Sequence, residues 1–213
     1  MQTQDLTVRR VGRLVTMAGD PVAGAAVVVR DGRVAWTGPD RDLPADAPAH
    51  ELDAGGACAL PGFVDAHTHL LFAGVRRDEF VARLAGRAYD GGGIRTTVAA
   101  TAAASDEELL DLAAARAAAA LAHGTTTMEV KTGYGLTVDA ELRLLRLVGE
   151  LGSRTPVRIE PTYLGAHVVP AGRDRSEYVD EVVATLPAAA AAGARWADVF
   201  CDEGVFTVDE ARR

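Results

Sequence analysis

The chain has 213 residues, of which 48% are hydrophobic and 24% are charged, a composition typical of a globular protein with one large domain, or one domain and a smaller one. Its 22 Lys and Arg residues against 30 Asp and Glu residues give a net charge of −8. This balance argues against nucleic acid or an anionic membrane as the main partner, because both bind basic surfaces. It still allows a small anionic substrate, which needs only one well-placed arginine.

The N-terminal part predicts short β-strands up to about residue 58. Asp31 and Gly32 stand between two apolar runs, and such a pair is typical of a type I′ hairpin turn, in which both central residues need positive φ. We expect the first part of a small β-sandwich domain over 1–58, with strands at 6–11, 14–17, 26–30, 33–38 and 51–53.

From residue 59 onward, strands and helices alternate, which predicts βαβ units and a parallel sheet. Capping boxes begin at Ser105 and Thr207, Gly124 and Gly152 are the expected helix stops, and Pro187 predicts a break in the third helix. Residues 70–101 are expected to form a long loop with a short helix at most. The strands are predicted at 61–67, 125–131, 157–164 and 196–201, with helices over 105–123, 138–151 and 176–192.

Four strands, followed by a helix that begins at Thr207 just before the last residue Arg213, predict the first half of a (β/α)8 barrel. We therefore expect an α/β fold with a partial, truncated barrel over 59–213. A small open sheet with a ragged end is the alternative.

Two cysteines, Cys58 and Cys201, stand outside any zinc-type spacing, so we expect buried thiols in a reducing compartment. The N-terminus lacks the apolar run of a signal peptide, and no apolar stretch is long enough to span a bilayer. A cytoplasmic protein is therefore expected, without a membrane or nucleic-acid partner; a homodimer remains open.

A His-x-His pair, His67 and His69, is expected at the carboxyl end of the first parallel strand. Residues i and i+2 of a strand point to one face, so both imidazoles can reach one metal ion. The carboxyl ends of the strands are also where barrel enzymes keep their active sites. A solvated loop with two chance histidines is the alternative.

The segment from Pro61 to His69, PGFVDAHTH, resembles the first-strand signature of the amidohydrolase superfamily, whose members place a metal site in a (β/α)8 barrel. From about residue 55 onward the chain resembles the imidazolonepropionase family in particular, and before that the resemblance is weaker. Five ordered blocks carry it, at residues 69–80, 91–94, 129–136, 162–167 and 198–203.

The resemblance implies hydrolysis of the cyclic amide of 4-imidazolone-5-propanoate to N-formimino-L-glutamate, a step of histidine degradation. It implies substrate contacts by Arg76, Tyr134 and His167, and more weakly by Tyr89. Arg76 would hold the substrate carboxylate, since a guanidinium matches a carboxylate with two hydrogen bonds. The structural alternatives are a surface arginine, loop tyrosines and a satisfied core histidine.

The resemblance also implies one divalent metal, zinc or iron, held by His67 and His69. Two-metal members use a carbamylated lysine at the end of the fourth strand, and here that strand ends in Phe200, Cys201, Asp202 and Glu203. Cys201 has no partner base in an obvious motif, so a buried thiol is expected there rather than a nucleophile.

The remaining metal ligands and the general acid/base of the family come from later strands, which this sequence does not contain. We therefore expect the 213-residue chain alone to be inactive. Two other functions remain open: another amidohydrolase, acting on a cyclic amide or deaminating a ring substrate, and a non-catalytic half-barrel that acts as a scaffold or is a fragment.

Overall fold

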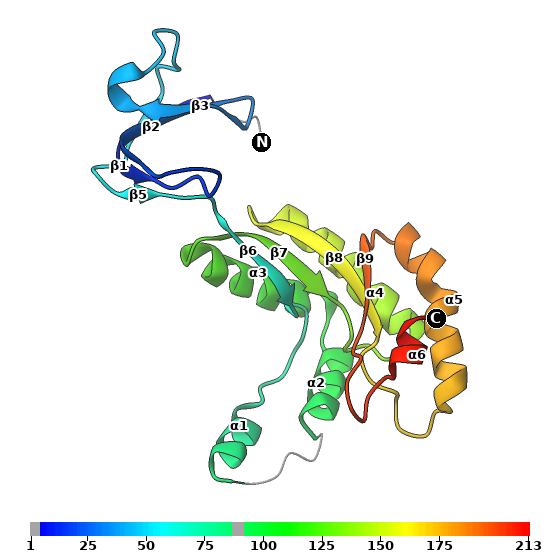
Figure 1. The fold of residues 1–213 in the computed structure, drawn as a ribbon. Helices are drawn as coiled ribbons and strands as arrows, with labels where there is room; N and C mark the ends of the chain where they lie inside the picture. Colours follow the sequence, from blue (N-terminus) through cyan, green and yellow to red (C-terminus); the bar gives the residue numbers. More distant parts are fainter. Residues whose placement is uncertain (1–4, 87–91) are drawn as a thin grey trace. The chain divides into compact units, whose positions relative to one another are not determined.

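The computed structural model describes residues 5–86 and 92–213, and it divides into two compact units, Met1–Gly62 and Phe63–Arg213 (Figure 1). The sequence predicted the boundary between Cys58 and Ala59. The assignment of the two parts to a sandwich domain and a barrel domain stays a prediction.

The first unit is one five-stranded sheet with the strand order β3-β2-β1-β4, in which β5 also pairs with β1. The two predicted strands at 6–11 and 14–17 form the single strand β1, which is irregular between Val8 and Val11. The described residues of this unit contain a single sheet, so the predicted sandwich is not shown. The elements are β1 (Leu6–Leu14), β2 (Val22–Arg30), β3 (Arg33–Pro39), the 3-10 turn η1 (Asp40–Asp42), β4 (Glu51–Asp53) and β5 (Cys58–Ala59).

The hairpin between β2 and β3 confirms the predicted turn. Asp31 has a φ of 49° and Gly32 a φ of 71°, as a type I′ turn requires. The twist of this turn matches the twist of the strands that it joins, so β2 and β3 pair along their length. Val11, Leu14 and Ala25 form the small buried core of the unit.

The second unit is an α/β structure built on a curled parallel sheet with the order β6-β7-β8-β9. The helices α3, α4 and α5 cover one face of this sheet, as Figure 1 shows. The four strands and the three helices are where the sequence predicted them, within a few residues at their ends. Their bounds are β6 (Phe63–Thr68), β7 (Thr125–Lys131), β8 (Arg158–Ala166), β9 (Trp196–Val199), α3 (Asp106–Ala122), α4 (Val138–Arg154) and α5 (Arg175–Ala191).

The predicted helix starts are also present. The Ser105 hydroxyl accepts the Glu108 N–H at 3.2 Å and caps α3. Thr207 and Glu210 form a full capping box at the start of the short α6 (Val208–Ala211), with the Thr207 N–H donating to the Glu210 carboxylate at 2.7 Å. Gly124 follows α3 with a φ of 95°, a conformation that favours glycine.

The prediction of one long loop over 70–101 is wrong. The structure has α1 (Arg77–Leu84) and α2 (Gly92–Ala103) there. The inward face of α2 carries Thr97 and Thr101, both 2% exposed. Because threonine is not counted as apolar, the helical periodicity of this stretch is hidden in the sequence.

Two predicted helix interruptions are wrong as well. Gly152 lies inside α4, which continues to Arg154, and Pro187 lies inside a continuous α5. Pro187 is exposed, so water can satisfy the carbonyl that its missing N–H leaves unpaired.

The two cysteines are free, as expected, but both are exposed and not buried. Cys58 lies in the two-residue strand β5, and Cys201 follows β9, which is an edge strand of its sheet. Positions at the edge of a sheet lack a neighbouring strand to cover them. Among the helices that the structure describes, none combines the length and the apolar character needed to cross a bilayer.

Candidate active site

A bulge in β6 directs the two candidate metal ligands. Asp65 pairs with Met128, and Thr68 pairs with Val130, so three steps along β6 face two steps along β7. Before the bulge, Ala66 lines the hollow on the open side of the sheet; after it, Thr68 lies opposite Val130, which is fully buried under the helices. The extra residue thus reverses the alternation of the strand, which is the usual effect of a β-bulge.

Four of the predicted site residues come together where β6, β7 and β8 end. The ring centroids of His67 and His69 are 5.6 Å apart, and those of His69 and Tyr134 are 5.2 Å apart. His167 stacks on His69 at 5.3 Å with an angle of 14° between the rings, and it lies 5.4 Å from Tyr134. The structure therefore places the candidate metal ligands beside two of the candidate substrate contacts.

His69 is half-buried and contacts the other three rings of this group. Its Nδ1 is buried and has no hydrogen-bond partner in the part of the chain that the structure describes. Burial, with the nearby charges of His167, His67 and Lys131, lowers the pKa of His69 to about 4. The imidazole is therefore neutral at pH 7, the form that binds a metal ion.

His167 is oriented by the backbone of the loop after β7. Its Nδ1 lies 2.7 Å from the Gly133 carbonyl oxygen, so this nitrogen carries the proton when the ring is neutral. A Cβ on Gly133, whose φ is 111°, would lie 2.8 Å from that same Nδ1, so only glycine lets the two come this close. Burial lowers the pKa of His167, and the positive charge of Arg76 acts in the same direction.

Arg76 is exposed in the segment between β6 and α1, and its positive charge contributes to the lowered pKa of His167. Tyr89, the weaker candidate, lies outside the described residues. Tyr134 and His167 thus lie beside the His69 ring, and the role of Arg76 stays a prediction.

The donor set is compatible with a metal ion but supplies only part of its coordination. His67 and His69 offer two imidazoles, and the unpartnered His69 Nδ1 is a ring nitrogen that no hydrogen bond occupies. Within residues 5–86 and 92–213, no cluster of three or more His, Cys, Asp or Glu side chains is arranged to hold a metal. A catalytic zinc site usually takes three protein ligands, so these two would need to be supplemented.

Three supporting residues of the site escaped the sequence analysis. Glu141, 1% exposed, accepts hydrogen bonds from the backbone of the loop that carries Tyr134. Arg116 donates to the carbonyl oxygens of Leu70 and Phe72, at 2.5 and 2.8 Å, directly after the histidine pair. Both act through backbone atoms, which leave no motif in the sequence.

The third is Lys131, which is 7% exposed at the end of β7. Its Nζ lies 2.7 Å from a Glu129 carboxylate oxygen and 2.9 Å from one of Asp198. Strand alternation could have indicated that Glu129 and Lys131 share a face, whereas the contact to β9 depends on the curl of the sheet. This ion-paired cluster lines a hollow of about 390 Å³ on the open side of the sheet.

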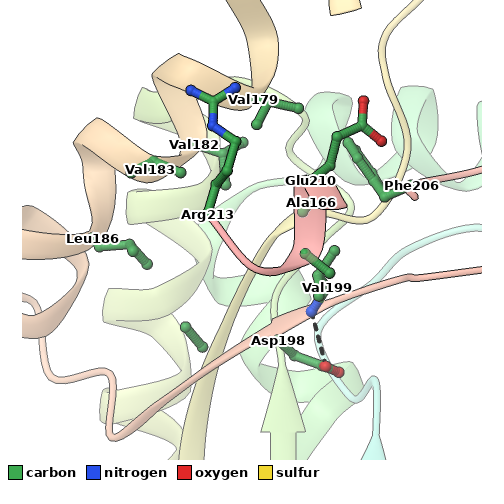
Figure 2. A pocket seen from close by; sticks show the side chains of 12 residues that line it. Ala166, Val179, Val182, Val183, Leu186, Asp198, Val199, Phe206, Glu210 and Arg213 are labelled. Atoms are coloured by element: carbon green, nitrogen blue, oxygen red, sulfur yellow. Dashed lines mark hydrogen bonds between the residues drawn. The ribbon is translucent and has the colours of Figure 1, made fainter. Parts of the chain in front are cut away.

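A second hollow lies between α5 and the segment from β9 to α6, and Figure 2 shows its lining. Val179, Val182, Leu186 and Phe206 make this lining mostly apolar, and none of the candidate site residues takes part in it. This hollow therefore offers mainly apolar contacts, and its lining has few groups that could take part in a reaction.

Relatives of the chain are found by sequence, although no family model matches it. It is 52% identical to an imidazolonepropionase from Salinispora arenicola, over 97% of this chain and 53% of that protein. It is 46% identical to an imidazolonepropionase from Mycolicibacterium smegmatis, over 97% of this chain and 52% of that one. The chain thus spans about half the length of the curated relatives that it matches.

Solved structures agree on the fold. An N-isopropylammelide isopropylaminohydrolase from Burkholderia multivorans is 28% identical, with a TM-score of 0.53 over 92% of this chain and 44% of that one. An atrazine chlorohydrolase from Arthrobacter aurescens, solved with zinc, is 18% identical, with a TM-score of 0.56 over 84% of this chain and 41% of that one. The curled sheet of the second unit is accordingly a fold that amidohydrolases share.

Proposed function

Because this chain corresponds over nearly its whole length to the N-terminal half of the imidazolonepropionases, we propose that it supplies the metal-binding and substrate-binding part of such an enzyme. The reaction is the hydrolysis of the cyclic amide of 4-imidazolone-5-propanoate to N-formimino-L-glutamate. The observation that supports it best is the convergence of His67, His69, Tyr134 and His167 at the carboxyl ends of three neighbouring strands.

In this proposal His67 and His69 are ligands of one divalent metal, zinc or iron. A metal ion of this kind lowers the pKa of a bound water and polarises an amide carbonyl. The neutral His69 ring and its unpartnered Nδ1 support the role, and so does the zinc in the structurally similar chlorohydrolase. Other amidohydrolases carry further ligands, so these two histidines are proposed as one part of the site.

The substrate-binding roles follow from the chemistry of the substrate. Arg76 carries a charge that suits the propionate carboxylate, and Tyr134 and His167 offer hydrogen-bonding groups to the ring. His167 donates its Nδ1 proton to the Gly133 carbonyl, so its Nε2 is left as an acceptor when the ring is neutral. A ring N–H of the substrate would satisfy that acceptor.

Metal content tests the proposal most directly. The protein is purified as its source produces it, and zinc and iron are measured by mass spectrometry for the unmodified protein and for His69→Ala. His123→Ala is the matched control, because His123 is an exposed histidine at the end of α3. We expect His69→Ala to lose both the metal and the hydrolytic activity, which is followed as the decrease in imidazolone absorbance. His123→Ala should keep both. Full metal content in His69→Ala would contradict the ligand assignment.

Another amidohydrolase reaction on a ring substrate is the second candidate. It is favoured by the 28% identity to the aminohydrolase from Burkholderia multivorans. Assays for ammonia or amine release from triazine and pyrimidine rings would separate the two. Turnover of such a ring with none of imidazolone propanoate would favour the second candidate.

A further inference from the structure

We propose that Glu141 is a positioning residue, whose carboxylate holds the loop after β7 so that Tyr134 faces His69 and His167. The proposal rests on the function proposed above only in that it takes Tyr134 as a substrate contact. The contacts of the carboxylate itself are independent of any reaction.

Both carboxylate oxygens of Glu141 bind the backbone of this loop. Oε2 accepts the Gly133 N–H at 2.7 Å, and Oε1 accepts the N–H groups of Gly135 and Leu136 at 2.7 and 2.8 Å. These three residues surround Tyr134 on both sides. The loop is therefore bound at its start and its end by one side chain from the first turn of α4.

The loop needs such an anchor because its backbone is unfavourable by itself. Leu136 has a φ of 57°, a conformation in which a leucine side chain crowds its own backbone, and Gly133 has a φ of 111°. Gly135 packs so closely on α4 that an added Cβ would lie 2.7 Å from the Ala140 carbonyl carbon. Without a strong partner for its N–H groups, this segment would relax to an ordinary turn.

Packing alone does not explain why a glutamate occupies position 141. The residue is 1% exposed, and a buried carboxyl group costs stability unless it is hydrogen-bonded. Burial raises the pKa of Glu141, and its hydrogen bonds from Thr132 and the loop oppose that rise. An apolar residue would fill the same space at a lower cost, whereas it could not fix three N–H groups of a loop that ends at a ring cluster.

The loop in turn determines where the rings of the site lie. The Gly133 carbonyl oxygen binds His167 Nδ1 at 2.7 Å, and the Tyr134 ring is 5.2 Å from the His69 ring. A shift of the loop would therefore move a tyrosine and a histidine together. Glu141 binds backbone N–H groups of the loop and acts on the two rings through them, which is what distinguishes a positioning residue from a substrate contact.

The test compares Glu141→Gln with Leu145→Ala in the protein as its source produces it. Leu145 lies on the same helix, is fully buried and packs with Tyr163 and Ala189, in a cluster other than the one that Tyr134 packs against. The glutamine keeps the shape of the side chain but has one carbonyl oxygen for three N–H groups. Three measurements are made: thermal stability, the NMR signals of the labelled Tyr134 ring, and the steady-state constants for imidazolone propanoate.

We expect Glu141→Gln to shift the Tyr134 ring signals and to raise KM roughly tenfold with kcat little changed, since losing hydrogen bonds to a charged group corresponds to about that factor. Leu145→Ala should lower thermal stability at least as much and leave the ring signals and KM unchanged. In a Tyr134→Ala background, adding Glu141→Gln should raise KM by less than it does in the unmodified protein, because only the effect through His167 is left.

Unchanged Tyr134 signals in a folded Glu141→Gln variant would overturn the proposal, and so would signals that shift equally in Leu145→Ala. The NMR readout needs no turnover, so a protein that fails to hydrolyse imidazolone propanoate contradicts the proposed function and not this inference. If Glu141→Gln does not fold, amide exchange in the unmodified protein decides. Slow exchange at Gly133, Gly135 and Leu136 supports the anchor, and fast exchange refutes it.

Discussion

The two faces of the β6–β9 sheet use the same strands for different purposes. On the face under α3 and α4, Met128 and Val130 of β7 are 3% and 0% exposed and belong to the main hydrophobic core. On the open face, Val64 is 68% exposed and Trp196 is 61% exposed. Burial of apolar surface stabilises the first face, whereas the second carries the histidines and the charged cluster around Lys131.

This contrast shows how one strand can separate stability from chemistry. Along β7, the residues of the helix-covered face alternate with Thr127, Glu129 and Lys131, which line the open hollow. Substitutions on the helix-covered face should therefore lower the stability most, and those on the open face should lower it less and should affect mainly the site.

The largest expected effect is on the helix-covered face. Leu151→Ala removes a fully buried side chain of α4 from the main core and should lower the free energy of unfolding by about 2–5 kcal/mol. Val64→Ala on the open face should change it by less than about 0.5 kcal/mol. Urea denaturation of the two variants measures both values, and similar losses would show that the two faces do not differ in this way.

A smaller effect is expected at the charged cluster. Lys131→Met leaves two carboxylates without their shared cation and should lower the free energy of unfolding by roughly 1–3 kcal/mol, because Asp198 is still partly exposed to water. The double variant Lys131→Met/Glu129→Gln should recover part of the loss, since it removes one of the two unpaired charges. An unchanged stability of Lys131→Met would mean that water already screens the cluster.

The stability of the folded protein should also depend on pH through His69 on the open face. Its pKa is lowered to about 4 by burial and by neighbouring positive charge, against about 6.5 for an unperturbed histidine. The unfolded chain therefore binds a proton first, and the stability of the metal-free protein should fall as the pH drops from about 6.5 towards 4. His69→Asn should reduce this slope, measured as thermal stability against pH. The same slope in the variant would assign it to other groups.

The smallest effect is expected at α6, on the surface. Arg175 and the Thr207 N–H lower the pKa of Glu210 to about 2. The ionised carboxylate therefore stabilises the folded chain fully above the pKa of the unfolded chain, near 4.5, and this stabilisation is lost as the pH falls towards 2. Limited proteolysis near the C-terminus should become faster over that range. Proteolysis of Glu210→Gln should be fast at every pH, and Asp209→Asn serves as the control because Asp209 forms an exposed ion pair with Arg212 and takes no part in the capping box. A Glu210→Gln variant as resistant as the control would contradict the role of the capping box.

The parts of the fold that local signals determine could be predicted from the sequence. Asp31 and Gly32 fix a turn by their own backbone preferences, and the Thr207 capping box needs only residues three apart. The helix around Thr97 and Thr101 could not be predicted, because tertiary packing buries these two polar residues on its inward face. The continuity of α5 through Pro187 could not be predicted either, because it depends on an exposed position that tolerates the lost hydrogen bond.

The candidate site divides in the same way. His67 and His69 are recognisable because two ligands of one type stand two residues apart. Glu141 and Arg116 were missed, since each binds backbone atoms of a distant loop and such contacts depend on the folded arrangement. Cys58 and Cys201 were expected inside the protein, and their places at sheet edges could be known only from the strand order.

The bulge in β6 has a consequence for protein engineering. Ala66 and His67 belong to different registers of the strand, so the wall of the hollow and the histidine pair can be chosen separately. A designer who grafted His-Thr-His onto a regular strand directly after Val64-Asp65-Ala66 would turn both imidazoles under the helices. The single extra residue is therefore as much a part of the transplantable unit as the two histidines.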